Sequence, residues 1–279
     1  MCIFSDRSTQ LVAIAAIPLL QVHLSPGMRN IKLTIAFDGT AYSGWQRQTN
    51  CPTIQGEIEK RLQLITTNRS ISLCGAGRTD AGVHARGMIA NFHTDNTISC
   101  PILLRGLNGL LPAAIRILEV CEVTPDFHAR FSAKSKTYTY SLCTGAIQLP
   151  LHRLYAVHVP HLTDHKTIQA CLETIKGTHD FSSFEATGSR DLLKPIGRGA
   201  IRTMHEATFT QSGPEAYQFK FSADGFLRHM VRNLVGTLLE AGKGRLTSLE
   251  FAQILKAGKR SAAGPTAPAH GLLLEQIFY

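Results

Sequence analysis

A glycine-rich run, GAGRTDAGVHARG at residues 75–87, contains a single carboxylate, Asp80, together with two arginines and one histidine. A loop of this composition suits three kinds of chemistry: a phosphate cradle, a tight turn in which the aspartate bonds its own backbone, or a nucleophilic carboxylate. Arg78 lies two residues from Asp80, and a neighbouring cation favours the ionised form of a carboxylate. An ionised carboxylate acts as a nucleophile or base, so the residue types alone leave the turn and the nucleophile open.

The glycine spacing argues against the phosphate cradle. No Gly-Lys-Ser/Thr sequence follows the glycines, as a P-loop would require. Gly75, Gly77 and Gly82 do not have the spacing of the dinucleotide-binding fingerprint, and no helical pattern begins after them. The run instead continues from a strand-like segment at residues 71–77, and the end of a strand can direct a loop into a cleft.

The composition is that of a globular protein with an anionic partner. Of 279 residues, 44% are hydrophobic and 18% are charged, and the formal net charge is +9 at pH 7. Residues 1–131 and 132–279 both carry an excess of basic side chains, of three and six respectively. Because Lys and Arg replace the counterions condensed on phosphate, nucleic acid is the expected partner. The seven cysteines form no C-x-x-C pair, which indicates reduced thiols in the cytosol and no zinc knuckle.

The N-terminal region has no apolar stretch long enough to span a bilayer. The nearest, LVAIAAIPLL at residues 11–20, has about half the required length. Its flank lacks the net positive charge of a signal peptide. Met28 directly precedes the first well-patterned strand. We therefore interpret residues 1–27 as an N-terminal extension and Met28 as an alternative start, in an intracellular protein.

The hydrophobic pattern of the first half predicts the order β-α-β-β-α-β. Apolar residues alternate from Ile31 to Phe37, as in a half-buried strand. They then recur at helical spacing from Ile54 to Ile65, after an N-cap at Thr53. The other expected elements are strands at 71–77 and 88–94, a helix at 101–112 and a strand at 115–123.

The second half repeats this order. The expected elements are a strand at 136–144, a helix ending at Gly177, a hairpin of 202–210 and 216–223, helices at 227–238 and 248–255, and a strand at 271–279. Each half therefore has the pattern of a ferredoxin-like unit. The predicted fold is α/β (α+β), with an antiparallel sheet in each half and a central active-site cleft. We expect an N-terminal domain at 28–131 that carries the Asp80 loop and a C-terminal domain at 132–279.

The run around Asp80 closely resembles the signature of the TruA-type tRNA pseudouridine synthases, the tRNA pseudouridine(38-40) synthase family, whose catalytic aspartate lies in a G-R-T-D-A-G-V-H-A run. The resemblance continues in order over most of the chain from Ile31. The similar blocks are FDGTAYSGWQRQ (37–48), LNGLLP (107–112), DFHARFSAKSKTYTY (126–140), DFSSF (180–184), FLRHMVRNLVG (226–236) and TAPAHGLLLEQIFY (266–279).

This resemblance implies an isomerase that converts uridine to pseudouridine at positions 38, 39 or 40 of the tRNA anticodon stem-loop. It implies Asp80 as the essential nucleophile, with neither a cofactor nor a metal. The C1′–N1 bond of the uridine is broken and the base is rejoined through C5, once the nucleotide has left its stack. The family also implies a cytoplasmic homodimer in which one tRNA contacts both subunits.

The resemblance also assigns roles to other residues. Arg78 is expected to partner Asp80 and to help fill the gap left by the flipped base. Tyr138 is expected to stack on the uracil, and Arg232 to lie near the aspartate. Arg228 and His229 are further candidates for substrate binding, ranked below Arg232. The residues expected along the RNA groove, or in its support, are His128, Arg130, Trp45, Gln46 and Arg47.

Several of these side chains also have a purely structural interpretation. Tyr140 lies on the same strand face as Tyr138, and a core aromatic and an active-site residue fit it equally well. Arg228 and Arg232 are one turn apart on the predicted 227–238 helix and off its apolar stripe, which also suits a solvated face. His84 is interpreted as a hydrogen-bonding residue that shapes the loop.

Three histidines have a spacing that invites a metal site, but we predict none. Pro160 separates His158 from His161, and only Asp164 accompanies them and His165, too little for a ligand set. The stretch 186–199 is predicted to be a flexible basic insertion.

Two other function classes fit the sequence less well. A catalytically silent RNA-binding protein would have a replaced aspartate and an RNP pattern of sheet aromatics, and the sequence has neither. A phosphate-handling enzyme would need the missing Lys-Ser/Thr pair.

Overall fold

The computed structural model describes residues 27–68, 70–189 and 197–279. Residues 1–26, on which the predicted alternative start depends, lie outside the described residues, and so does the middle of the predicted insertion at 186–199. Within the described ranges, every helix is too short or too polar to cross a bilayer.

The first half has the predicted order of elements. These are β1 (Arg29–Phe37), α1 (Ile54–Thr66), β2 (Cys74–Gly75), β3 (His84–Thr94), α2 (Cys100–Leu110) and β4 (Ile115–Val123). β1 pairs antiparallel with both β3 and β4, and β2 pairs antiparallel with β3. The neighbour order is therefore β4-β1-β3-β2, and alternate β1 residues such as Leu33 and Ile35 are fully buried, as the period-2 pattern predicts.

The second half repeats this arrangement with additions. Its elements are β5 (Ser135–Cys143), β6 (Val157–His158), α3 (His165–Thr174), β7 (Gly177–Asp180), β8 (Ile201–Gly213), β9 (Ala216–Ala223), α4 (Met230–Gly242), α5 (Ser248–Ala257) and β10 (Leu272–Phe278). The strand order is β10-β5-β9-β8-β7, with the two-residue β6 beside β5. Without the short β6 and β7, this is the neighbour order of the first half.

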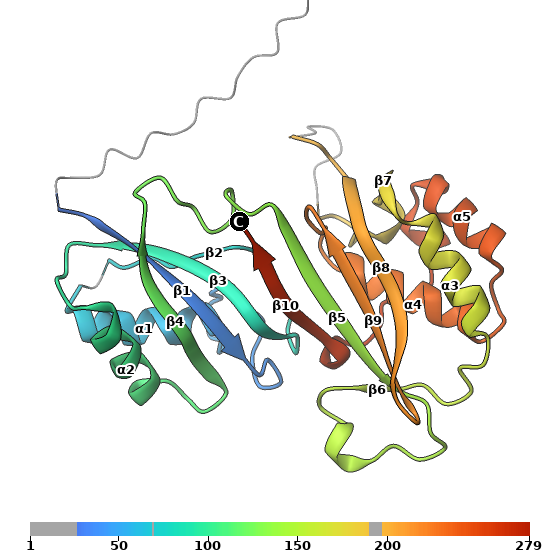
Figure 1. Cartoon of the computed structure of the whole chain (residues 1–279), viewed down its shortest axis with the longest axis horizontal. Helices are drawn as coiled ribbons and strands as arrows, with labels where there is room; N and C mark the ends of the chain where they lie inside the picture. The colour runs from blue at the N-terminus through green and yellow to red at the C-terminus, as the bar shows by residue number, and fades with distance from the viewer. Residues whose placement is uncertain (1–26, 69, 190–196) are drawn as a thin grey trace, which may run out of the picture.

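The α/β class and the mostly antiparallel pairing are confirmed, but the two half-sheets are joined. β10 pairs in parallel with β3 through Leu273 opposite His84 and Leu274 opposite Ala85, which makes one sheet of ten strands. Figure 1 shows β10 between β3 and β5, at the seam of the two halves. The seam is tight, because a Cβ at Gly87 would lie 2.6 Å from the Glu275 carbonyl oxygen.

Helix α4 begins later than the sequence pattern predicts. The apolar spacing placed its start at Leu227, whereas the helix begins at Met230. His229 has a left-handed backbone, with φ of 61° and ψ of 1°, and such a residue cannot continue an α-helix. Arg228 therefore precedes the helix, which corrects the expectation that it lies one helical turn from Arg232.

The first turn of α4 packs against the segment 263–267. Gly236 allows the close approach, because a Cβ there would lie 1.7 Å from the Pro265 carbonyl oxygen. The Ala267 amide donates to the Arg232 carbonyl oxygen at 3.0 Å. The predicted capping box of Thr247 and Glu250 at the start of α5 is confirmed. The contacts of Gly236 and Arg232 with the segment 263–267 hold the start of α4 where it faces the Asp80 loop.

Candidate active site

The Asp80 loop connects β2 to β3 and is held by backbone contacts. The Ala76 amide donates to the Ile89 carbonyl oxygen at 2.8 Å, and the Trp45 amide donates to the Thr79 carbonyl oxygen at 3.1 Å. Gly44 has φ of +93°, and a Cβ there would lie 2.5 Å from the Thr79 carbonyl oxygen. A side chain at position 44 would therefore displace the loop, and the glycine is needed for the approach.

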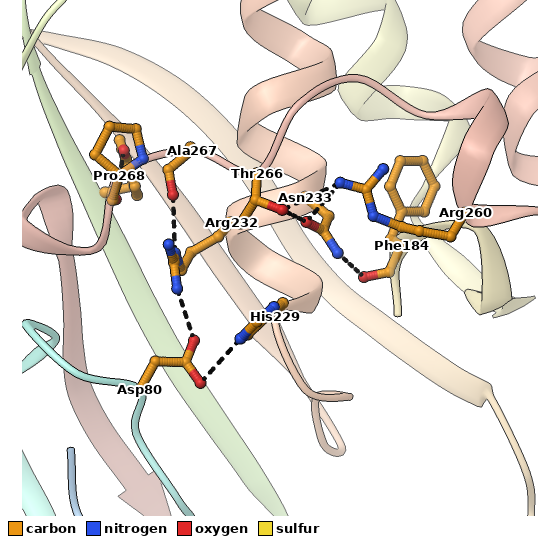
Figure 2. A network of polar contacts seen from close by, with 10 residues as sticks. Asp80, Phe184, His229, Arg232, Asn233, Arg260, Thr266, Ala267 and Pro268 are labelled. Carbon is orange, nitrogen blue, oxygen red and sulfur yellow. Dashed lines mark hydrogen bonds and ion pairs between the residues drawn. The ribbon is translucent and has the colours of Figure 1, made fainter. Parts of the chain in front are cut away.

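The carboxylate of Asp80 contacts two side chains from the other half of the chain. Its Oδ2 accepts a hydrogen bond from Arg232 Nη1 at 3.0 Å, and its Oδ1 lies 3.4 Å from His229 Nε2. The Asp80 side chain is 26% exposed and that of Arg232 is 16% exposed. Figure 2 shows the carboxylate between these two side chains. The carboxylate is thus oriented and still reachable from solvent.

Arg232 is itself fixed by its surroundings. Its Nε donates to the Ala267 carbonyl oxygen at 2.8 Å, so its guanidinium joins the segment before β10 to the aspartate. The next residue, Asn233, is fully buried and donates to the Phe184 carbonyl oxygen at 2.8 Å. Its Oδ1 accepts from Thr266 at 2.6 Å and from Arg260 at 3.1 Å (Figure 2). A satisfied buried network of this kind gives the start of α4 one defined position.

His229 contacts Asp80, although the sequence favoured Arg232 for this position. Its pKa is lowered from the ordinary value, chiefly by burial and further by Arg232, Arg228 and Arg260, although the charge of Asp80 opposes the shift. The imidazole is therefore neutral at pH 7, and its contact with Asp80 becomes an ion pair only at acid pH. The left-handed backbone that turns His229 toward the loop has no local sequence signature.

The two tyrosines of β5 differ in role. Tyr138 is 9% exposed and lies edge-on to Phe226, with ring centroids 5.0 Å apart. Burial raises its pKa, and the negative charge of Asp80 raises it further, so the hydroxyl stays protonated beside the carboxylate. Tyr140 is fully buried, and its hydroxyl donates to the Pro268 carbonyl oxygen at 2.8 Å. Tyr140 is therefore a core residue, which settles the alternative that the sequence left open.

Arg78 is not the cation that contacts Asp80. Its side chain is exposed on the loop. Among the described residues, the basic side chains within 4 Å of the Asp80 carboxylate are Arg232 and His229. The side chains that contact Asp80 are thus 149 and 152 residues away in the sequence, whereas Arg78 is two residues away. Arg78 is exposed and close to Asp80 in sequence, so its predicted contact with a flipped nucleotide stays a prediction.

The other expected RNA-groove residues lie in three places. His128 contacts Cys74, at the start of the loop, with Nε2 and Sγ 3.3 Å apart, and the neighbouring Arg130 is exposed. Arg228 is exposed and lines an open cavity of about 580 Å³ together with His229 and Arg260. The three residues of the GWQRQ block divide differently: Trp45 is buried under the loop, while Gln46 and Arg47 are exposed.

Three further histidines singled out in the sequence have structural contacts. His84 Nδ1 accepts from the Gly39 amide at 3.1 Å and Nε2 lies 3.0 Å from the Leu154 carbonyl oxygen, which fits a loop-shaping role. His158 and His165 each contact a backbone carbonyl oxygen through Nε2, at 2.7 Å and 3.1 Å. Across residues 27–68, 70–189 and 197–279, no group of three or more His, Cys, Asp or Glu side chains could hold a metal ion.

The arrangement therefore supplies one oriented, accessible carboxylate, an arginine that neutralises it, and a protonated tyrosine beside it. A carboxylate in these surroundings can attack an electrophilic carbon or accept a proton.

Comparison with known proteins points to one family. A family model described as tRNA pseudouridine synthase matches residues 33–132 and 172–279. The tRNA pseudouridine synthase A 1 of Desulfotalea psychrophila is 56% identical over 252 residues, covering 90% of this chain and 100% of that protein. The tRNA pseudouridine synthase A of Acetivibrio thermocellus is 41% identical over 252 residues, with the same coverage of 90% and 100%.

A solved structure, that of a Cbf5-Nop10-Gar1 complex, is also similar over 88% of this chain and 48% of the matched one. Its identity is 12% and its TM-score is 0.35, a likeness too low to bear on the fold or the site.

Proposed function

This chain belongs to the tRNA pseudouridine synthase family, and on that premise we propose that it isomerises uridine at one or more of positions 38, 39 and 40 of the tRNA anticodon stem-loop, with Asp80 as the nucleophile. The observation that carries the proposal is the pairing of Asp80 with Arg232, in a 3.0 Å contact that joins the two halves of the chain beside Tyr138.

The reaction is an isomerisation, so all atoms of the uridine stay in the product. The C1′–N1 bond breaks, the uracil turns, a C1′–C5 bond forms, and C5 loses the proton that N1 gains. Asp80 fits three roles in this sequence: attack on C1′, attack on the base, or removal of a sugar proton. Each role needs a carboxylate that keeps a free lone pair while a cation holds its orientation, and the contact with Arg232 provides that. No step calls for a cofactor.

The target uridine must leave its stack to reach Asp80, at a cost of a few kcal/mol. Arg78, which is exposed two residues before Asp80, is the side chain that we expect to occupy the gap left by the flipped base. Tyr138, protonated and buried against Phe226, offers a rigid ring on which the uracil can stack. Arg130 and Arg228 contribute exposed basic side chains toward the RNA backbone, and His128, whose pKa is lowered by burial, supports the same groove as a neutral ring at pH 7.

We also propose that the protein acts as a cytoplasmic homodimer of which both subunits contact one tRNA, each subunit being built from the units 28–131 and 132–279. The segment between β5 and β6 exposes three large aliphatic side chains: Ile147 at 82%, Leu149 at 58% and Leu151 at 85%. An exposed apolar group of this kind suits a protein partner. Light scattering of the purified protein checks the proposal, which a monomeric mass at micromolar concentration contradicts.

The central test is the Asp80→Asn variant, with Asp95→Asn as the matched control because Asp95 is an exposed loop aspartate. Pseudouridine is mapped in the anticodon arm of tRNA from cells that lack the gene and are supplied with each variant. We expect Asp80→Asn to form no detectable pseudouridine and Asp95→Asn to match the wild type. Unchanged modification by Asp80→Asn contradicts the role of the aspartate. Transcripts with a single uridine at 38, 39 or 40 test which position is modified. Modification confined to other sites contradicts the proposed positions.

A further inference from the structure

The turn between β4 and β5 presents an aromatic ring to solvent. Phe131 is 76% exposed, which is unusual for a large apolar side chain. Its ring lies 4.3 Å from that of His128, centroid to centroid, with an angle of 32° between the planes. The guanidinium carbon of Arg130 is 5.7 Å from the centroid of the same ring. The exposed ring is thus supported on part of its surface by a histidine and has a cation beside it.

Buried polar side chains hold this turn in place. Asn91, 2% exposed, accepts from the Ala129 amide at 2.9 Å. Asn30, 1% exposed, donates to the Phe127 carbonyl oxygen at 2.8 Å. The hydroxyl of the C-terminal residue, Tyr279, donates to the Ala129 carbonyl oxygen at 2.7 Å. Since each buried polar group is satisfied by the turn, the backbone that carries Phe131 is rigid before any ligand binds.

The turn also lies beside the start of the Asp80 loop, in a positive environment. His128 contacts Cys74, and Lys136 Nζ donates to the Ala76 carbonyl oxygen at 2.7 Å, four residues before Asp80. The pKa of Lys136 is lowered to about 8, first by burial and then by Arg130, Arg202 and Arg198. These arginines therefore create a positive potential where the turn meets the loop.

We propose that Phe131 is a stacking platform for an unpaired base of the RNA substrate, with Arg130 and His128 completing the platform. This inference rests on the proposed function, because it takes the ligand to be RNA. An aromatic ring beside cations is how proteins bind single-stranded bases without reading their identity. The exposed aliphatic group at 147–151, in contrast, has no aromatic ring in contact with an arginine, and it suits a protein surface instead. A rigid platform lowers the entropic cost of ordering a flexible RNA loop.

The test compares Phe131→Ala, Phe131→Tyr and Leu249→Ala in the full-length protein. Leu249 is the matched control because it is a large apolar residue, 69% exposed, on α5. Binding of an anticodon-arm RNA is measured by fluorescence anisotropy, and thermal unfolding checks that each variant is folded. We expect Phe131→Ala to weaken binding on the order of tenfold. Phe131→Tyr is expected to restore it, and Leu249→Ala to leave it unchanged.

A salt series separates stacking from charge. Phe131→Ala is expected to keep the slope of log affinity against log salt, whereas Arg130→Gln is expected to reduce that slope by about one. Equal affinity of Phe131→Ala and the wild type overturns the platform, as does failure of the tyrosine variant to restore binding. The proposed function is judged separately, by pseudouridine formation with the wild-type protein: if the wild type binds through Phe131 but forms no pseudouridine, the platform stands and the proposed function fails.

Discussion

The two halves of the chain share a strand order but contribute different parts of the site. In both, the four main strands have the neighbour order fourth, first, third, second. The first half supplies Asp80 on a loop, and the second supplies Arg232 and His229 at the start of α4 and Tyr138 on β5. Neither half alone supplies both Asp80 and the side chains that contact its carboxylate. The chemistry therefore depends on how accurately β10 joins the halves at β3.

The manner in which each half holds its residues also differs. Asp80 is on a loop held by backbone contacts and by the Lys136 side chain, which donates to the Ala76 carbonyl oxygen, and the Asp80 side chain keeps 26% exposure. Arg232 is followed by the fully buried Asn233, whose amide group bonds Phe184, Thr266 and Arg260. The nucleophile thus stays accessible to a nucleotide while the arginine stays fixed. We therefore expect substitutions in the second half of the chain, remote in sequence from Asp80, to reduce the rate of the reaction severely.

The largest expected effect comes from Arg232→Met. Loss of the guanidinium removes the hydrogen bond to Asp80 and the link to Ala267, so we expect kcat to fall about 10²–10³-fold. Single-turnover kinetics on tRNA measures the change. Arg245→Met is the control, since Arg245 pairs with Glu240 at the surface with 68% exposure, and we expect it to match the wild type. A loss of less than threefold for Arg232→Met means that the first half orients Asp80 without help.

The second effect concerns the seam itself. A Cβ at Gly87 would lie 2.6 Å from the Glu275 carbonyl oxygen, so Gly87→Ala must push β10 away from β3. We expect a loss of about 1–3 kcal/mol in the free energy of unfolding, measured by urea denaturation, with a lower kcat.

The control for the seam is Gly109→Ala. Gly109 lies in α2 with open space around it, so alanine there is expected to stabilise by about 0.5–1 kcal/mol. If Gly87→Ala lowers stability while kcat is preserved, the site does not depend on an exact seam.

Local patterns predicted the parts of each half but not their junction. The alternation from Ile31 to Phe37 and the helical spacing of α1 depend on neighbours in sequence, and both elements form as expected. The strand that joins the halves was predicted too, at 271–279, because its apolar pattern is local. The pairing of this strand with β3 was not predicted, because the apolar pattern of a strand does not indicate which strand lies next to it.

The same limit explains the errors at the site. Sequence proximity favoured Arg78 as the partner of Asp80, whereas the observed partners come from α4 and the residue before it. The apolar spacing from Leu227 concealed the left-handed residue His229, because periodicity does not report a single backbone angle. Arg232 was predicted only through the family resemblance, and its contact with the carboxylate joins residues that are 152 positions apart.

The third prediction uses pH to distinguish the contact of Asp80 with His229 from its contact with Arg232. The folded pKa of His229 is below its ordinary value of 6.5, so below that value the unfolded chain binds more protons at this residue than the folded one. His229 therefore contributes stability above pH 6.5, and the contribution is lost as pH falls toward the folded pKa. His229→Gln is expected to lose less stability than the wild type between pH 7 and 5, as measured by urea denaturation.

At pH 7.5 we expect His229→Gln to lower kcat only about fivefold, because the 3.4 Å contact of the neutral imidazole with Asp80 contributes no more than a neutral polar interaction. The exposed His205 provides the control variant, His205→Gln, which should follow the wild-type pH dependence. Identical pH profiles of stability for the wild type and His229→Gln contradict the lowered pKa.

The smallest effect is expected from the ion pair of Arg86 and Glu275, which crosses the seam next to Gly87. Its arginine is 68% exposed, so water and salt screen the attraction, and a double-mutant cycle with alanine should give a coupling of about 0.2–1 kcal/mol. The pair Lys220 and Glu206, which links β8 to β9 within one half, provides the comparison at similar exposure. If the seam is held by its close backbone contact, the two couplings are equal and kcat is unchanged in Arg86→Ala. A coupling above 2 kcal/mol for the seam pair alone means that charge joins the halves. In that case salt weakens the seam. The loss in the free energy of unfolding caused by Gly87→Ala must then become larger at high salt, which urea denaturation measures.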